Sequence, residues 1–82
     1  MSKDHIQNKV KTLRFFRDEM TQQQLADEVG VTRQTVAAIE SGKYSPSLEV
    51  VFRIANVFNV TLDEVFTYDS SKDKFKKRKK SK

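Results

Sequence analysis

The chain contains no cysteine, and its 82 residues include only two glycines and one proline. Without cysteine no disulfide can stabilise a fold of this size, which fits the reducing cytoplasm. Because residues that break helices are scarce, we expect one mostly helical domain. No apolar run approaches the roughly 20 residues of a membrane span, and no signal-peptide core follows the first residues. We therefore expect a cytoplasmic protein without a membrane partner.

Catalytic and metal-binding residue sets are also lacking. His5 is the single histidine, so a metal site would have neither cysteine nor a second histidine as ligand. The sequence offers no Ser/His/Asp set, no glycine-rich phosphate loop and no opposed pair of carboxylates. We therefore expect a protein that is not an enzyme and binds no cofactor.

Charge is distributed unevenly along the chain. Residues 70–82 hold eight Lys and Arg against one Asp, whereas residues 1–69 hold eight against ten Asp and Glu. The sequence predicts a folded domain over 1–69 and a basic, disordered tail over 70–82, because the tail cannot bury enough apolar area to order itself. A mildly acidic domain can bind a polyanion only through individually placed residues.

Apolar residues recur every three or four positions in several segments, which predicts helices. The first is expected at about residues 7–18, with Ile6, Val10 and Leu13 on one face. Thr21 and Gln24 form a T-x-x-Q capping box at the start of the second helix. The fourth helix should be the most buried, since it carries a broad apolar face: Leu48, Val51, Phe52, Ile54, Ala55 and Phe58.

The last elements are short. Ser47 can cap the fourth helix, and Thr61 with Glu64 forms a second capping box that opens a fifth helix ending near Phe66. Residues 66–68 could continue as a short strand. The aromatic rings of this half have core spacing, so we expect them to pack inside the protein: Phe52, Phe58 and Phe66.

Residues 22–39, QQQLADEVGVTRQTVAAI, are the most informative segment. Their apolar residues are spaced to lie on the inner sides of two crossing helices: Leu25, Val29, Val31, Val36 and Ile39. Ala26 is small enough for the point of closest approach, Gly30 suits a turn with positive φ, and Thr32 can cap the second helix. This is the pattern of a helix-turn-helix, which places its second helix in the major groove of DNA.

The start of that second helix carries residue types that read base edges. Arg33 can bond O6 and N7 of guanine, and Gln34 can bond N6 and N7 of adenine. Thr35, Ala37 and Ala38 lie nearby. They either shape a pocket for a thymine methyl group or are neutral surface residues.

With these residues the chain resembles a known family, the small Cro/CI-type (Xre-like) helix-turn-helix regulators. The matching text is LR (13–14), TQQQLADEVGVTRQTVAAIESGKYSPSLE (21–49), IANVFNV (54–60) and DEVF (63–66). The resemblance implies an all-α, five-helix phage-repressor fold, to which a small terminal β pairing could be added. Two features depart from the family pattern: the Phe15–Phe16 pair with the spacing before Thr21, and Ala37 where a polar residue is common.

The resemblance also implies roles for individual residues. In the resembling repressors, the glutamine that matches Gln22 bonds a DNA phosphate. The glutamate that matches Glu40 pairs with an arginine of the first helix, here Arg14, with Arg17 as the alternative.

Residues past the recognition helix return toward DNA in this fold. Ser41 and Lys43 are expected to contact phosphates, whereas Tyr44 either bonds a phosphate or packs its ring. The candidate DNA-binding residues are therefore Gln22, Thr32, Arg33, Gln34, Thr35, Ala37, Ala38, Ser41, Lys43 and Tyr44.

The function expected from this sequence is sequence-specific binding of double-stranded DNA by a homodimeric transcription regulator, a repressor. The dimer interface is expected at the fifth helix and residues 66–68, because Val65, Phe66 and Tyr68 exceed what a small core requires. Two alternatives stay open: an antitoxin that also masks a toxin protein, and an interaction module that has lost DNA binding.

Overall fold

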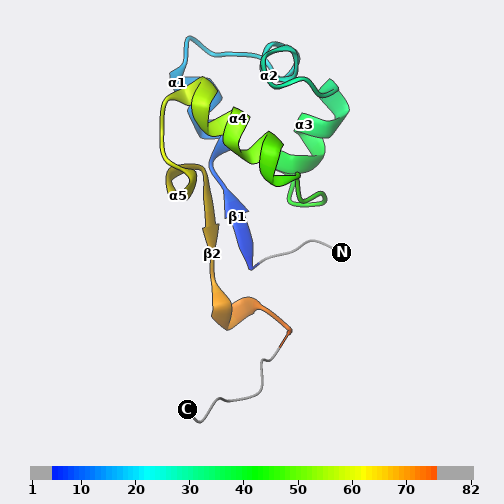
Figure 1. The fold of residues 1–82 in the computed structure, drawn as a ribbon, viewed down its shortest axis with the longest axis vertical. Helices are drawn as coiled ribbons and strands as arrows, with labels where there is room; N and C mark the ends of the chain where they lie inside the picture. The colour runs from blue at the N-terminus through cyan, green and yellow to red at the C-terminus, as the bar shows by residue number, and fades with distance from the viewer. Residues whose placement is uncertain (1–4, 76–82) are drawn as a thin grey trace.

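The computed structural model describes residues 5–75, which form five α-helices and a two-stranded antiparallel sheet (Figure 1). The helices are α1 (Val10–Phe16), α2 (Gln22–Val29), α3 (Arg33–Glu40), α4 (Leu48–Phe58) and α5 (Leu62–Val65). The strands are β1 (Ile6–Asn8) and β2 (Phe66–Tyr68). The five helices and the small terminal sheet confirm the predicted fold class. No helix within residues 5–75 is long and apolar enough to cross a bilayer.

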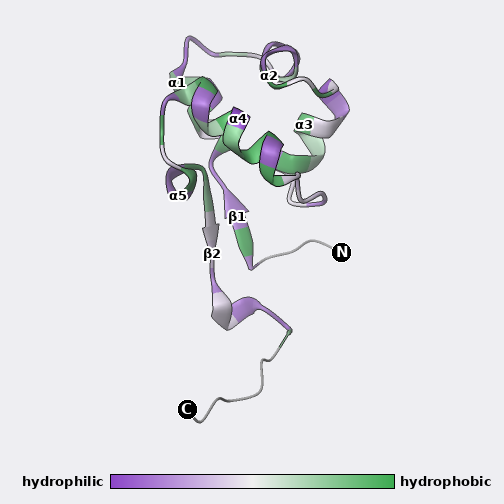
Figure 2. Cartoon of the chain, in the orientation of Figure 1, coloured by the Kyte–Doolittle hydropathy of each residue, from purple (hydrophilic) through white to green (hydrophobic). Residues whose placement is uncertain are grey.

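The core lies where the helices meet. Every fully buried side chain among the described residues is apolar: Val10, Leu25, Ala26, Val29, Val36, Ile39, Ile54, Ala55 and Val65. More than half of them come from the 22–39 segment, as its apolar spacing predicted, and Val31 packs against them half-buried. Figure 2 shows hydrophobic residues along much of α4 and hydrophilic residues at the start of α3.

Side-chain caps set the starts of the middle helices. The Thr21 hydroxyl accepts the Gln24 backbone N–H at 3.0 Å, and the Gln24 side chain accepts the Thr21 backbone N–H at 2.8 Å. This capping box begins α2 as predicted. The Ser47 hydroxyl likewise accepts the Val50 N–H at the start of α4. At the other end of α4, Asn59 takes a left-handed conformation with φ of 56°.

The predicted extent of the first helix was wrong. α1 covers only Val10–Phe16, because residues 6–8 instead pair as β1 with β2, Ile6 opposite Tyr68 and Asn8 opposite Phe66. The pairing gives their backbone groups partners that a frayed helical turn would lack. The helix also stops early, since Asp18 and Glu19 turn the chain with φ of 55° and 53°.

The expectation for the fourth helix was also wrong in part. α4 buries Ile54 and Ala55, but Leu48 is 66% exposed and Phe52 is 53% exposed. The neighbouring helices cover only one stripe of α4, so the outer part of its broad apolar face has no partner within the described chain. Phe58 and Phe66 do pack against the core, as predicted.

The chain keeps some structure after β2. Ser70–Lys72 form a 3-10 helix, and the Tyr68 hydroxyl donates to an Asp73 carboxylate oxygen at 2.7 Å. That bond lowers the pKa of Asp73 and raises the pKa of Tyr68. The predicted tail therefore starts with one turn of 3-10 helix. Residues 76–82 lie outside the described part of the chain, and the tail there stays a prediction.

Candidate nucleic-acid interface

Helices α2 and α3 form the helix-turn-helix that the sequence predicted. Ala26 is completely buried at 0% exposure, as a residue at the point of closest helix approach must be. Gly30 ends α2 with φ of 80°, a conformation that strains residues with a Cβ. An added Cβ there would also lie 3.3 Å from the Arg53 guanidinium. The turn geometry therefore fixes how α3 is presented.

The first turn of α3 points its polar side chains outward. Thr32 caps the helix by accepting the Thr35 backbone N–H at 3.1 Å, and its hydroxyl lies 3.0 Å from that of Thr35. Arg33 and Gln34 follow directly and are both exposed. Ala37 and the neighbouring alanine are half-buried on the same helix. The capped first turn of α3 thus carries two long side chains that can donate hydrogen bonds, beside two small alanines. Such a surface is suited to approaching base edges.

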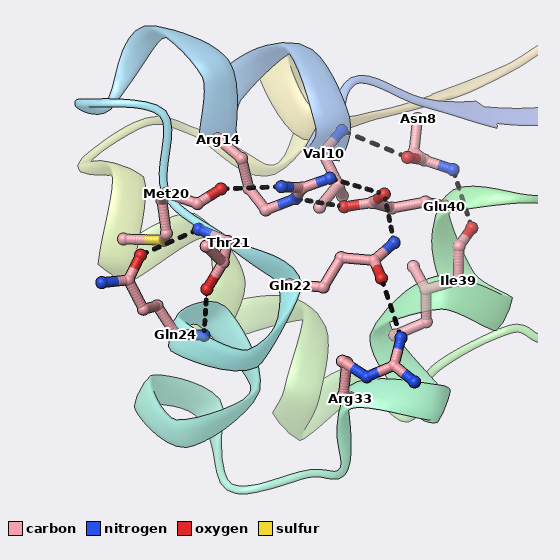
Figure 3. Close-up of polar contacts among 10 residues, drawn as sticks. All are labelled: Asn8, Val10, Arg14, Met20, Thr21, Gln22, Gln24, Arg33, Ile39 and Glu40. Carbon is pink, nitrogen blue, oxygen red and sulfur yellow. Dashed lines mark hydrogen bonds and ion pairs between the residues drawn. The ribbon is translucent and has the colours of Figure 1, made fainter.

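Gln22 lies beside Arg33, although 11 positions separate them in the sequence (Figure 3). Arg33 Nη1 is 3.5 Å from the Gln22 side-chain oxygen, at the long end of the hydrogen-bond range. Gln22 Nε2 donates to Glu40 Oε1 at 3.1 Å. The sequence did not predict the bond between Gln22 and Glu40, because the two residues are on different helices and their spacing gives no sign of it. The structure thus connects a predicted phosphate-binding residue to a predicted base-reading residue.

The predicted ion pair between Arg14 and Glu40 is confirmed. Arg14 Nε and Nη2 donate to the two Glu40 carboxylate oxygens at 2.6 and 3.0 Å. The two side chains are only 13% and 7% exposed. Arg14 also donates to the Met20 carbonyl at 2.7 Å, which ties the turn after α1 to the pair. Arg17, the alternative partner, instead donates to the Val57 carbonyl.

The end of α3 turns sharply toward the next loop. The Gly42 N–H donates to the Ile39 carbonyl and the Lys43 N–H to the Ala38 carbonyl, each at 3.0 Å, with φ of 81° at Gly42. This double closure is the Schellman motif. Ser41 donates its hydroxyl to the same Ala38 carbonyl. The side chain of Lys43 is exposed beyond the helix end.

Tyr44 lies at the edge of an apolar hollow rather than in the core, and it is 49% exposed. The hollow has a volume of about 390 Å³. Apolar side chains from both strands, the loop and the helices make up most of its wall: Ile6, Ile39, Tyr44, Pro46, Val51, Leu62 and Phe66. The sequence did not predict this hollow, since its residues come from four separate stretches of the chain. It adjoins the Schellman turn, because Gly42 also lines it.

Within residues 5–75, no group of three or more His, Cys, Asp or Glu side chains could hold a metal ion. The described chain instead brings together side chains that form hydrogen bonds. They lie at the start of α2 (Gln22), the start of α3 (Arg33) and the turn after α3 (Ser41).

Comparison with known proteins identifies the family of this chain. The helix-turn-helix family matches residues 13–65, and the chain belongs to that family. An HTH-type transcriptional regulator of Methanocaldococcus jannaschii is 45% identical over 64 residues, covering 78% of this chain and 96% of the relative. The regulator YgzD of Bacillus subtilis is 49% identical over 61 residues, covering 74% and 91%. The chain is therefore a DNA-binding transcriptional regulator and not an enzyme.

A solved structure shows the same fold. The crystal structure of a candidate DNA-binding protein from Bacteroides fragilis matches with a TM-score of 0.65, covering 76% of this chain and 98% of that one. The two sequences are 24% identical. At this identity the likeness supports the arrangement of helices and no individual residue role.

Proposed function

We propose that the chain binds double-stranded DNA in a sequence-specific manner and represses transcription, with α3 lying in the major groove. The observation that carries the proposal is the exposure of Arg33 and Gln34 on the capped first turn of α3. Arginine at this position would read guanine and glutamine would read adenine. Thr35, Ala37 and Ala38 would lie close enough to the groove to favour a thymine methyl group.

Phosphate contacts would set the register of α3 in the groove. Gln22 opens α2, where unpaired backbone N–H groups favour an anion. Ser41 and Lys43 follow α3, and the hydroxyls of Thr32 and Tyr44 would extend the same backbone contacts. The Glu40 carboxylate would not repel DNA strongly, because Arg14 neutralises it.

We further propose a homodimer whose interface is the apolar hollow and the face of α4 beside it. Leu48 and Phe52 lie one turn apart on α4, with Val51 of the hollow between them. Val65, expected at the interface, is fully buried and so belongs to the monomer core. Two copies joined there would present two recognition helices to half-sites about 34 Å apart.

Selection of bound duplexes from a random DNA pool tests the DNA-binding proposal. A palindromic consensus with two half-sites one helical turn apart is expected. Equal binding to all duplexes at moderate salt would contradict it, because non-specific affinity comes from phosphates alone. Repression is tested by placing the selected site over a promoter with a reporter gene. The reporter must distinguish repression from activation, because relatives of both kinds exist. One from Vibrio cholerae is named a repressor, and one from Enterococcus faecalis is named an activator.

An antitoxin is the second candidate function, and one observation favours it. Phe15 and Phe16 are 61% and 77% exposed and stack edge to face at the end of α1, outside the two helices of the helix-turn-helix. A partner protein could cover this pair while α3 remains on DNA. Co-expression with the product of a neighbouring gene tests this role, and rescue of growth by the parent but not by Phe16→Ser is expected. In either role the cytoplasm is the proposed location.

A further inference from the structure

The Glu40 carboxylate accepts more hydrogen bonds than its ion pair accounts for. Its Oε2 atom accepts Arg14 Nε at 2.6 Å. Its Oε1 atom accepts both Arg14 Nη2 at 3.0 Å and Gln22 Nε2 at 3.1 Å (Figure 3). A single carboxylate on the last residue of α3 therefore holds a side chain from α1 and a side chain from the start of α2.

The contact with Glu40 decides which way the Gln22 amide faces. A carboxylate accepts hydrogen bonds and cannot donate them, so it must face the NH₂ group of the amide. The amide oxygen then faces the other way, toward the Arg33 guanidinium at 3.5 Å. The opposite amide orientation would place NH₂ against a guanidinium, which also only donates. Both neighbours of Gln22 thus favour the same rotamer.

We propose that Glu40 is a positioning residue for DNA reading, which acts through Gln22 to orient the guanidinium of Arg33. This inference rests on the proposed function, because Arg33 must read a base for its orientation to matter. The buried ion pair supplies rigidity: Arg14 holds the Glu40 carboxylate in place and neutralises it. The second hydrogen of the Gln22 NH₂ group stays available for a DNA phosphate. Pre-orientation of this kind lowers the conformational entropy lost on binding.

The first variant replaces both partners of the ion pair, Arg14→Met together with Glu40→Met. Apolar replacement of a whole buried pair is often neutral for stability, so this protein should stay folded. It removes the acceptor of Gln22 and leaves Gln22 and Arg33 unchanged. The preference for the selected duplex, over one changed at the base pair read by Arg33, should fall about tenfold, within the range of one bidentate base contact. A purely structural ion pair predicts an unchanged preference in a folded variant.

A measurement on the free protein separates this inference from the proposed function. Gln22 and Gln23 are neighbours on α2, and Gln23 bonds only the exposed Asp27 carboxylate of its own helix. The ¹⁵N heteronuclear NOE of the Gln22 side-chain amide should exceed that of Gln23, and it should fall to the Gln23 level in the double variant. Equal values in the parent would overturn the proposal. If the parent prefers no duplex, the proposed function fails, while the NOE still decides whether Glu40 orders Gln22.

A second variant covers the case in which the double variant does not fold. Gln22→Met keeps the ion pair, and Gln23→Met is its matched control on the same helix. Gln22→Met should lower the duplex preference about tenfold, and it should not lower it further when Arg33→Ala is already present. Equal weakening on every duplex, with the preference unchanged, would reduce Gln22 to a phosphate contact and overturn the proposal. Gln23→Met should keep the parent preference.

Discussion

The guanidinium of Arg14 and the carboxylate of Glu40 meet through two hydrogen bonds, 2.6 and 3.0 Å long, in a site that is nearly closed to water. Removing one partner leaves the other charged and buried. We expect Arg14→Ala to lower the free energy of unfolding by about 3–5 kcal/mol. Urea denaturation measures this loss, with Glu49→Ala as control, because the Arg53–Glu49 pair is largely exposed. Similar losses in the two variants would show that burial of the first pair contributes little.

Arg33→Ala should weaken binding to the selected duplex by about 1–3 kcal/mol and relax the choice at one base pair, because a bidentate contact is lost. The fold should be unaffected, since the side chain is exposed and its hydrogen bond is the long one to Gln22. Repeating the duplex selection with the variant measures the effect. An unchanged consensus would mean that Arg33 does not read a base.

Ala26→Leu should destabilise the domain by about 1–3 kcal/mol or more, because three extra carbon atoms would be forced between α2 and α3. Ala26 is fully buried there, which leaves no space for a larger side chain. Thermal melting followed by circular dichroism measures the change, and the half-buried Ala37 serves as the control position. A melting temperature equal to that of the parent would place the helix crossing elsewhere.

Phe52→Lys should yield a folded monomer, because the ring is 53% exposed and its loss leaves the core intact. A lysine in an apolar interface would have to bury its charge when two copies associate. Sedimentation equilibrium at several concentrations measures association, and Gln23→Lys, at an exposed position of α2, is the control. If the parent is itself a monomer at high concentration and binds one to one on DNA, the dimer proposal is wrong.

Truncation after Phe75 should weaken DNA binding without changing the consensus. Residues 76–82 carry six Lys and Arg. Each phosphate that they neutralise should steepen the salt dependence by about 0.9 in log–log slope. Cutting here keeps the Tyr68–Asp73 hydrogen bond. Affinity and salt slope equal to those of the parent would exclude the tail from binding, and a changed consensus would mean that it reads bases as a minor-groove arm.

The sequence by itself determined the helix-turn-helix. Caps such as Thr21 and Thr32 act on backbone N–H groups three residues away, so their effect is local and can be read from spacing. The core positions of α2 and α3 followed from a period of three and four residues. The resemblance to Cro/CI-type regulators supplied the pairing of Arg14 with Glu40.

Only the tertiary structure decided the features that join distant segments. Ile6 fits a helical period, yet it forms a strand because β2 offers backbone partners from the far end of the described chain. Phe52 has core spacing, yet its exposure depends on where the neighbouring helices stop covering α4. The bond from Gln22 to Glu40 requires the start of α2 to lie beside the end of α3. Local patterns carry no information about such contacts, because these depend on how whole elements pack.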